Sequence, residues 1–160
     1  MTTGLQITTP TDTTIVLARS FKAARRLVWE AMTSPDKMKR WMLPPPGLTL
    51  SVCEVEPRVG GTLKLAWKSA DADPVMTLHG EWTEFAPHER MVHTETMTAG
   101  TGEIVVSLVE THEFTETGGV THMRITQTYR SKEDRDGALA GGVDEGMEAC
   151  YRELDAVVAL

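Results

Sequence analysis

The residues best suited to chemistry are two histidines and two glutamates in the neighbouring segments "MVHTETM" and "VETHEFT". Side chains two residues apart in a strand share a face, so His93 lies with Glu95, and Glu110 lies with His112. Both pairs face the core if the apolar residues around them do. A histidine beside a carboxylate can act as a general base, because the imidazole pKa lies near neutrality. These four residues are therefore the catalytic candidates.

Other interpretations of the four residues stay open. The set could instead orient a carbonyl or hydroxyl group of a ligand, or hold a metal ion. It could also consist of hydrogen-bonded or solvent-reaching sheet residues, since a one-residue bulge would turn all of them outward. The loop "AGTG" pairs Thr98 near Glu103, which predicts that His93 lies beside Leu108 and diagonal to Glu110. We assign no metal and no cofactor to the chain.

Neighbouring strands can add further polar groups to this cluster. Gln127 and Tyr129 share the parity of the apolar residues in the last strand, and Glu84 shares the parity of Trp82. No motif marks an enzyme class: the sequence has no G-x-S-x-G, no phosphate-binding glycine loop and no zincin helix. Any prediction of catalysis therefore rests on this cluster alone.

Composition limits the partners. The net charge is -7, with 16 basic and 23 acidic residues, which argues against a protein that binds nucleic acid. No apolar run approaches the ~20 residues of a membrane span, and the start lacks the basic and apolar regions of a secretory signal. Cys53 and Cys150 lie far apart and form no metal-type pair. We expect two reduced thiols, a cytoplasmic location and no stable membrane insertion.

The elements that position the cluster follow from periodicity. Residues 1–11 are polar and predict a flexible arm, and residues 12–160 predict a single domain. "TTIVLARSF" indicates a strand and "AARRLVWEAMT" a helix. Ser34-Pro35 predicts a second short helix over "PDKMKRWM", which the prolines at 44–46 must end.

The rest of the chain predicts a meander and a helix. Strand-like segments recur between turns such as Gly60-Gly61 and "DADP": they are "LTLSVCEVE", "TLKLAWK", "VMTLHGEWTEF", "MVHTETM", "EIVVSLVETHEFT" and "VTHMRITQTYR". A long apolar-striped helix then starts at Ser131, with four glycines in its first half that suggest close approach, a kink or softness. The order predicts an α+β fold whose antiparallel sheet is covered by the C-terminal helix.

This order resembles the START-like (SRPBCC) superfamily and, more narrowly, the family named for the activator of heat-shock-protein-90 ATPase. The matching stretches are "FKAARRLVWEAMTSPDKMKRWM", "EVEPRVGGTLKL", "HGEWTEFAPHERMVHTE", "HEFTETGGVTHMRIT" and "YRSKEDRDGALAGGVDEGMEACYRELD". The resemblance implies a helix-grip fold, in which a curved sheet of about 6–7 strands wraps around the C-terminal helix. It also implies an elongated apolar cavity between the two.

The resemblance implies binding of a small hydrophobic or amphipathic molecule, because family members bind lipids, polyketides or plant hormones. A cyclase- or hydrolase-type enzyme and a chaperone-partner or other protein-interaction module are the alternatives, and homodimerisation through an edge strand stays open. We expect Trp41 and the glycine-rich half of the last helix to form the entrance. The predicted ligand-binding residues are Trp41, Met42, Leu65, Trp67, Met76, Leu78, Trp82, His93, Glu95, His112, Phe114, Met123, Tyr129, Val143, Met147 and Cys150.

Overall fold

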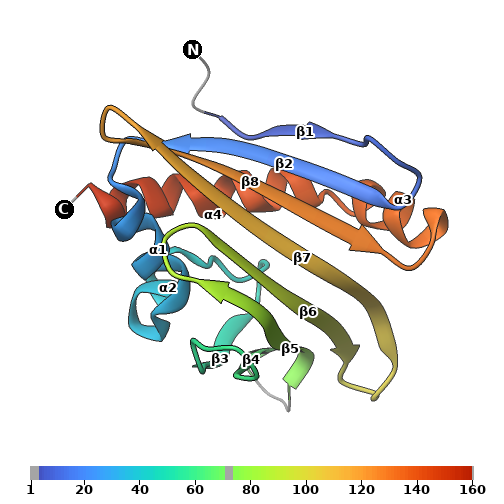
Figure 1. Ribbon diagram of the computed structural model, residues 1–160. Coiled ribbons are helices and arrows are strands. Elements are labelled where there is room, and N and C mark those ends of the chain that lie inside the picture. The colour runs from blue at the N-terminus through green and yellow to red at the C-terminus, as the bar shows by residue number, and fades with distance from the viewer. Residues whose placement is uncertain (1–3, 71–73, 160) are drawn as a thin grey trace.

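The computed structural model describes residues 4–70 and 74–159 (Figure 1). Most of the predicted "DADP" turn falls on residues 71–73, outside the described residues. One antiparallel sheet of eight strands has the order β1-β2-β8-β7-β6-β5-β4-β3. The strands are β1 (Gln6–Thr8), β2 (Thr14–Phe21), β3 (Thr49–Val55), β4 (Thr62–Lys68), β5 (Pro74–Ala86), β6 (Arg90–Ala99), β7 (Ile104–Thr117) and β8 (Val120–Tyr129).

The sheet curves around the C-terminal helix, as Figure 1 shows, so the predicted helix-grip fold is confirmed. The strand count is higher than predicted because Gln6–Thr8, within the expected loose arm, pairs with β2. Ile7 lies opposite Leu17, and the N–H of Leu5 donates to Glu148 Oε2 at 3.0 Å. These contacts fasten a short, threonine-rich segment whose own pattern is too weak to indicate a strand.

Two short helices, α1 (Arg25–Thr33) and α2 (Pro35–Trp41), follow β2 as predicted and close one end of the grip. Trp41, at the end of α2, is buried, and its Nε1–H donates to the carbonyl oxygen of Ala31 at 2.7 Å. Its ring also lies 6.0 Å from that of Tyr151 on the last helix. Trp41 is thus anchored between the helices, with its basic neighbours Lys39 and Arg40 exposed.

The expected C-terminal helix is present but is divided in its glycine-rich first half, where a kink was one of the expectations. It consists of α3 (Lys132–Ala140) and α4 (Val143–Val158). The break falls at Gly142, whose φ of 78° is a left-handed conformation that glycine adopts at low cost. Ser131 caps α3 as predicted, with its Oγ accepting from the N–H of Asp134 at 3.1 Å. The break places α3 at the end of the sheet remote from α1 and α2 (Figure 1).

A buried arginine fixes α4 against the sheet. Arg19 shares the inward face of β2 with Leu17 and Phe21, and its Nε donates to Glu148 Oε2 at 3.0 Å. Its guanidinium also lies 4.9 Å from the centre of the Phe21 ring. No helix in the described part of the chain is long and apolar enough to cross a bilayer.

Candidate functional site

Two adjoining cavities lie between the concave face of the sheet and the helices. The inner cavity measures about 220 Å³ and lies beneath α2 and α4, where Trp41, Trp67 and Trp82 line it. The outer cavity measures about 580 Å³ and lies between strands β6–β8 and α3. Glu95 and Gln127 line both volumes, so the cavities meet at these two polar side chains.

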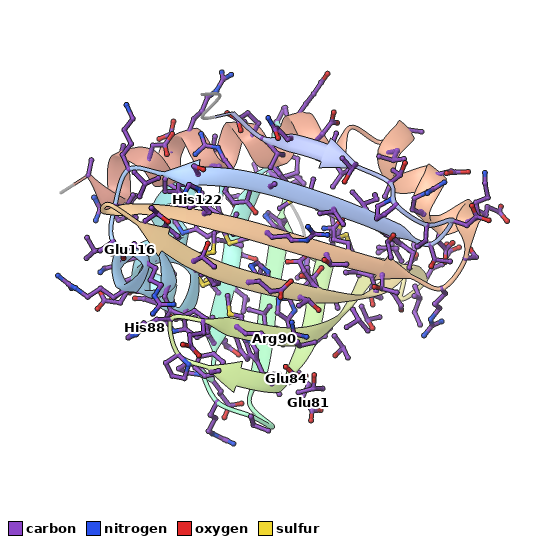
Figure 2. The ribbon with its side chains drawn as sticks, turned by 45° about the horizontal axis from the view of Figure 1, so that its top comes forward. Glu81, Glu84, His88, Arg90, Glu116 and His122 are labelled. Carbon is purple, nitrogen blue, oxygen red and sulfur yellow. The ribbon has the colours of Figure 1, made fainter. Side chains whose placement is uncertain are left out.

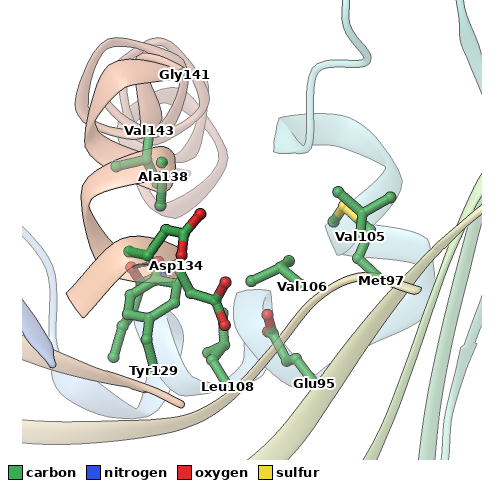
Figure 3. Close-up of a pocket in the computed structure, with 13 residues that line it drawn as sticks. Glu95, Met97, Val105, Val106, Leu108, Tyr129, Asp134, Ala138, Gly141 and Val143 are labelled. Atoms are coloured by element: carbon green, nitrogen blue, oxygen red, sulfur yellow. Dashed lines mark hydrogen bonds between the residues drawn. The ribbon is translucent and has the colours of Figure 1, made fainter. Parts of the chain in front are cut away.

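Figure 3 shows the outer cavity with α3 on one side and the β6–β7 hairpin on the other. Ala138 and Val143 project from the helices, while Met97, Val105 and Val106 project from the strands. The glycine-rich start of the predicted last helix therefore does line the cavity, through Gly137 and Gly141 among others. Val105 and Val106 were not predicted as cavity residues, because their pattern is that of ordinary strand residues.

The polar cluster sits on β6 and β7, where the predicted register is wrong by two residues. His93 lies directly opposite Glu110, and Leu108 lies opposite Glu95. Two one-residue shifts add up to this difference: Thr98 pairs with Ile104 rather than Glu103, and a bulge then lets Met97 pair with Val106. Because the total shift is two residues, the predicted parity of β7 is kept, and His93 and Glu110 share the concave face.

Four side chains form a continuous hydrogen-bonded chain on that face. His112 Nε2 and Glu110 Oε1 are 2.7 Å apart, and Gln127 Nε2 donates to Glu110 Oε2 at 2.9 Å. The hydroxyl of Tyr129 then donates to Gln127 Oε1 at 2.8 Å. All four residues are buried, which removes the interpretation in which the cluster reaches solvent.

His93 and Glu95 extend the cluster from β6. His93 Nε2 lies 3.8 Å from Glu110 Oε1, and its Nδ1 lies 3.7 Å from Glu95 Oε1 and 3.4 Å from the carbonyl oxygen of Thr94. The side chain of His93 is 5 % exposed and that of Glu95 is 16 % exposed. Glu95 is thus the more accessible end of the cluster, at the junction of the cavities.

The environment shifts the pKa values of the two carboxyl groups, Glu95 and Glu110, in opposite directions. Burial raises the pKa of Glu95, and the negative charge of Glu110 raises it further. Burial would also raise the pKa of Glu110, but the hydrogen bond and charge of His112, with help from His93 and Gln127, hold it below its usual value. Burial lowers the pKa of His93, against the attraction of Glu110. The cluster therefore favours a charged Glu110 beside a neutral Glu95 and a neutral His93.

Two buried nitrogen atoms in the described residues have no hydrogen-bond partner: Trp82 Nε1 and His112 Nδ1. Both residues line the inner cavity. An unpaired buried polar group costs about 1–3 kcal/mol, so a ligand atom that bonds to it recovers that free energy. The Trp82 N–H is a donor, which suits an oxygen acceptor.

The structure places most predicted ligand-binding residues on a cavity wall. Three do not line either volume: Met76, Phe114 and Met123. Phe114 and Met123 are instead buried in the core, where the Phe114 ring lies 5.5 Å from that of Trp29. The others line the cavities: Trp41, Met42, Leu65, Trp67, Leu78, Trp82, His93, Glu95, His112, Met147 and Cys150 the inner one, and Glu95, Tyr129 and Val143 the outer one.

Glu84 does not join the cluster, contrary to its predicted parity. A bulge between Trp82 and Glu84 reverses the facing of the strand, since Trp82 pairs with His93 and Glu84 pairs with Val92. Glu84 is consequently exposed and forms a 2.8 Å ion pair with Arg90, which Figure 2 shows on the outside of the sheet. Bulges of this kind leave no clear mark in a single sequence.

The family whose sequence profile matches residues 22–159 is described as "Activator of Hsp90 ATPase homolog 1-like protein". The chain belongs to this family. The family predicted from the sequence is thereby confirmed. No curated protein matches the chain in sequence.

Solved structures of this fold cover almost the whole chain. A protein from Rhodobacter sphaeroides is 26% identical, with a TM-score of 0.84 over 97% of each chain. A protein from Mycobacterium smegmatis is 20% identical, with a TM-score of 0.81 over 96% of this chain and 95% of that one. An Arthrobacter aurescens protein is 20% identical, with a TM-score of 0.79 over 96% and 91%. The last two likenesses concern the fold alone.

Proposed function

We propose that this protein binds a small amphipathic molecule between its sheet and its C-terminal helices. The observation that carries the proposal is an apolar volume that ends at a cluster of polar side chains. Small-molecule sites usually measure about 300–1,000 Å³ and combine apolar walls with a few convergent polar groups. The outer cavity, of about 580 Å³, falls in that range, and the inner cavity extends it past Glu95.

The apolar body of the ligand would supply most of the affinity. Burial contributes about 25 cal/mol per Å² of apolar surface, and tryptophan and methionine side chains dominate the inner wall. Methionine side chains are flexible and polarisable, so they adapt to ligands of different shape. The methionines on the inner wall are Met32, Met38, Met42, Met91 and Met147.

The polar end of the ligand is not an anion in this proposal. No lysine or arginine occurs among the described residues that line either cavity, whereas four acidic residues do: Glu95, Glu110, Glu133 and Asp134. A ligand carboxylate would lose its hydration beside these groups without gaining a cation. An ester, ketone or alcohol oxygen can instead accept from the Trp82 N–H.

The cyclase or hydrolase alternative rests on the same histidines. A general base works best when its pKa is near the working pH, and burial moves the pKa of His93 downward from its ordinary value. His93 is thus a weaker base than a free histidine. The arrangement supports orientation of a ligand better than proton abstraction.

The two unpaired cysteines, Cys53 and Cys150, fit a reducing compartment such as the cytoplasm.

A matched pair of ligands tests the proposal. Methyl octanoate and octanoate share the same eight-carbon acyl chain but differ in charge. Their binding can be measured by calorimetry in buffer containing EDTA. We expect methyl octanoate to bind with one-to-one stoichiometry and octanoate to bind at least tenfold more weakly, about 1.4 kcal/mol. Absence of binding, or equal affinity for both, would overturn the proposal.

A further inference from the structure

We propose that His93, Glu110 and His112 bind one divalent transition-metal ion on the floor of the inner cavity. One ligand atom from each residue can be chosen so that all lie within 4.8 Å of one another, and all three residues are buried. Two imidazoles and one carboxylate form a donor set that holds zinc or iron(II) in proteins. The proposal does not depend on the amphipathic ligand.

The strand pairing brings the three donors to one point. His93 lies opposite Glu110 in the ladder, and His112 follows Glu110 by two residues on the same face. Glu110 Oε1 lies 2.7 Å from His112 Nε2 and 3.8 Å from His93 Nε2. A tetrahedral ion with bonds of about 2.0–2.1 Å needs roughly 3.3 Å between its ligand atoms. The two distances bracket this value, so small side-chain rotations would admit the ion.

Neighbouring groups hold the donors in the orientation that a metal needs. Gln127 donates to Glu110 Oε2, which leaves Oε1 directed at the histidines, and Tyr129 in turn fixes the Gln127 amide. Thr94 provides a carbonyl oxygen 3.4 Å from His93 Nδ1, on the side of the ring away from Glu110. Partners of this kind set the tautomer and angle of metal ligands in known sites.

Three protein donors leave at least one coordination position for another molecule. The donors line the inner cavity, so that position faces the cavity and the neighbouring carboxyl group of Glu95. The ion would offset the negative charge of Glu110, and its open position would accept a water molecule or a ligand oxygen. The metal-loaded protein should therefore tolerate a carboxylate ligand better than the metal-free protein.

Cobalt(II) and zinc(II) serve as probes of the metal-free, full-length protein. We expect visible Co²⁺ absorption bands of a site with nitrogen ligands, one ion per chain, and displacement by Zn²⁺. His93→Gln and His112→Gln should each weaken Zn²⁺ binding at least tenfold, while His79→Gln, at an exposed residue on β5, should leave it unchanged. Binding that these two cluster variants do not weaken, or no Co²⁺ bands, would overturn the proposal.

A measurement on the wild-type chain covers the case in which a variant fails to fold. The protein contains 5 histidines, whose imidazole nitrogen signals can be followed by NMR after ¹⁵N labelling. We expect Zn²⁺ to shift the signals of two of them, His93 and His112, at one equivalent. Equal small shifts of all the histidines, or shifts at His79, His88 or His122 alone, would contradict the site. Methyl octanoate binding in EDTA is a separate measurement, so either proposal can fail without the other.

Discussion

Arg19 and Asp155 join the first long strand to the last helix through two parallel hydrogen bonds, each 2.8 Å long. The side chain of Arg19 is 2% exposed, whereas that of Asp155 is 45% exposed. The guanidinium is therefore the desolvated partner, and the carboxylates of Asp155 and Glu148 are what make its burial tolerable. Helix α4 is held on the sheet by charge as well as by its apolar stripe.

Removing the carboxylates should cost more than removing the arginine. The double substitution Glu148→Ala and Asp155→Ala leaves a buried guanidinium unpaired, which should lower the free energy of unfolding by about 3–5 kcal/mol. Arg19→Met should cost less, because both carboxylates reach water and the methionine keeps apolar contacts. Urea unfolding followed by circular dichroism gives both values.

Arg152→Ala, which removes an exposed ion pair to Glu148, is the control and should change stability by less than about 0.5 kcal/mol. A larger loss in Arg19→Met than in the double variant would contradict the account.

The same ion pair predicts a loss of stability in acid. Burial would raise the pKa of Glu148, but its hydrogen bonds from Arg19 and Leu5 hold the pKa below the ordinary value of 4.5. The unfolded chain then binds the proton more readily, so the contribution of Glu148 is complete above pH 4.5 and is lost as the pH falls below it. The stability gap between wild type and Glu148→Gln should be largest at pH 7 and shrink toward pH 3. A stability gap that grows in acid would contradict this account. Glu145→Gln, at an exposed residue of α4, is the control and should leave the stability at pH 7 unchanged.

The break between α3 and α4 depends on one glycine. Gly142 has a φ of 78°, where a side chain costs about 1–2 kcal/mol, whereas Gly141 has a φ of -77°. Gly142→Ala should therefore lower the melting temperature by roughly 2–8 °C, at about 2–4 °C per kcal/mol for a chain of this size. Gly141→Ala is the matched control and should leave the melting temperature unchanged or raise it slightly. Equal effects of both substitutions would mean that the left-handed conformation is not required.

Filling the outer cavity should weaken ligand binding without weakening the fold. Gly137 lines that cavity, and a Cβ added there meets no atom within 4 Å. Gly137→Phe should reduce the affinity for methyl octanoate at least tenfold in calorimetry. Gly146→Phe is matched, because Gly146 is also an exposed helical glycine with free space around its Cβ, but it lines neither cavity. Equal affinities in the two variants would show that the ligand binds elsewhere.

The sequence predicts the fold well because local patterns dominate it. Alternation along β4 places Leu63, Leu65 and Trp67 on the buried face, and Ser34-Pro35 begins α2. Single-residue irregularities could not be predicted in the same way. The bulge beside Met97 changes which residue lies opposite His93, and without that register the three residues proposed as metal ligands do not meet.

Long-range charge pairing is the other part that escaped prediction. Arg19 stands in "TIVLARSF" at the parity of Leu17 and Phe21, so its inward direction could be read from alternation. Its partners cannot be read in that way, because Glu148 and Asp155 lie 129 and 136 residues further along the chain. A charged residue at an inward position is the signal that such partners exist.

Methionine methyl NMR during a titration with methyl octanoate tests the central claim most directly. Methyl groups on the cavity walls should shift in a saturable way, while those of Met76 and Met123, which line neither cavity, should keep their positions. No shift at saturating ester, or shifts confined to Met76 and Met123, would contradict a ligand site between the sheet and the helices. The methionines expected to shift are Met32, Met38, Met42, Met91, Met97 and Met147.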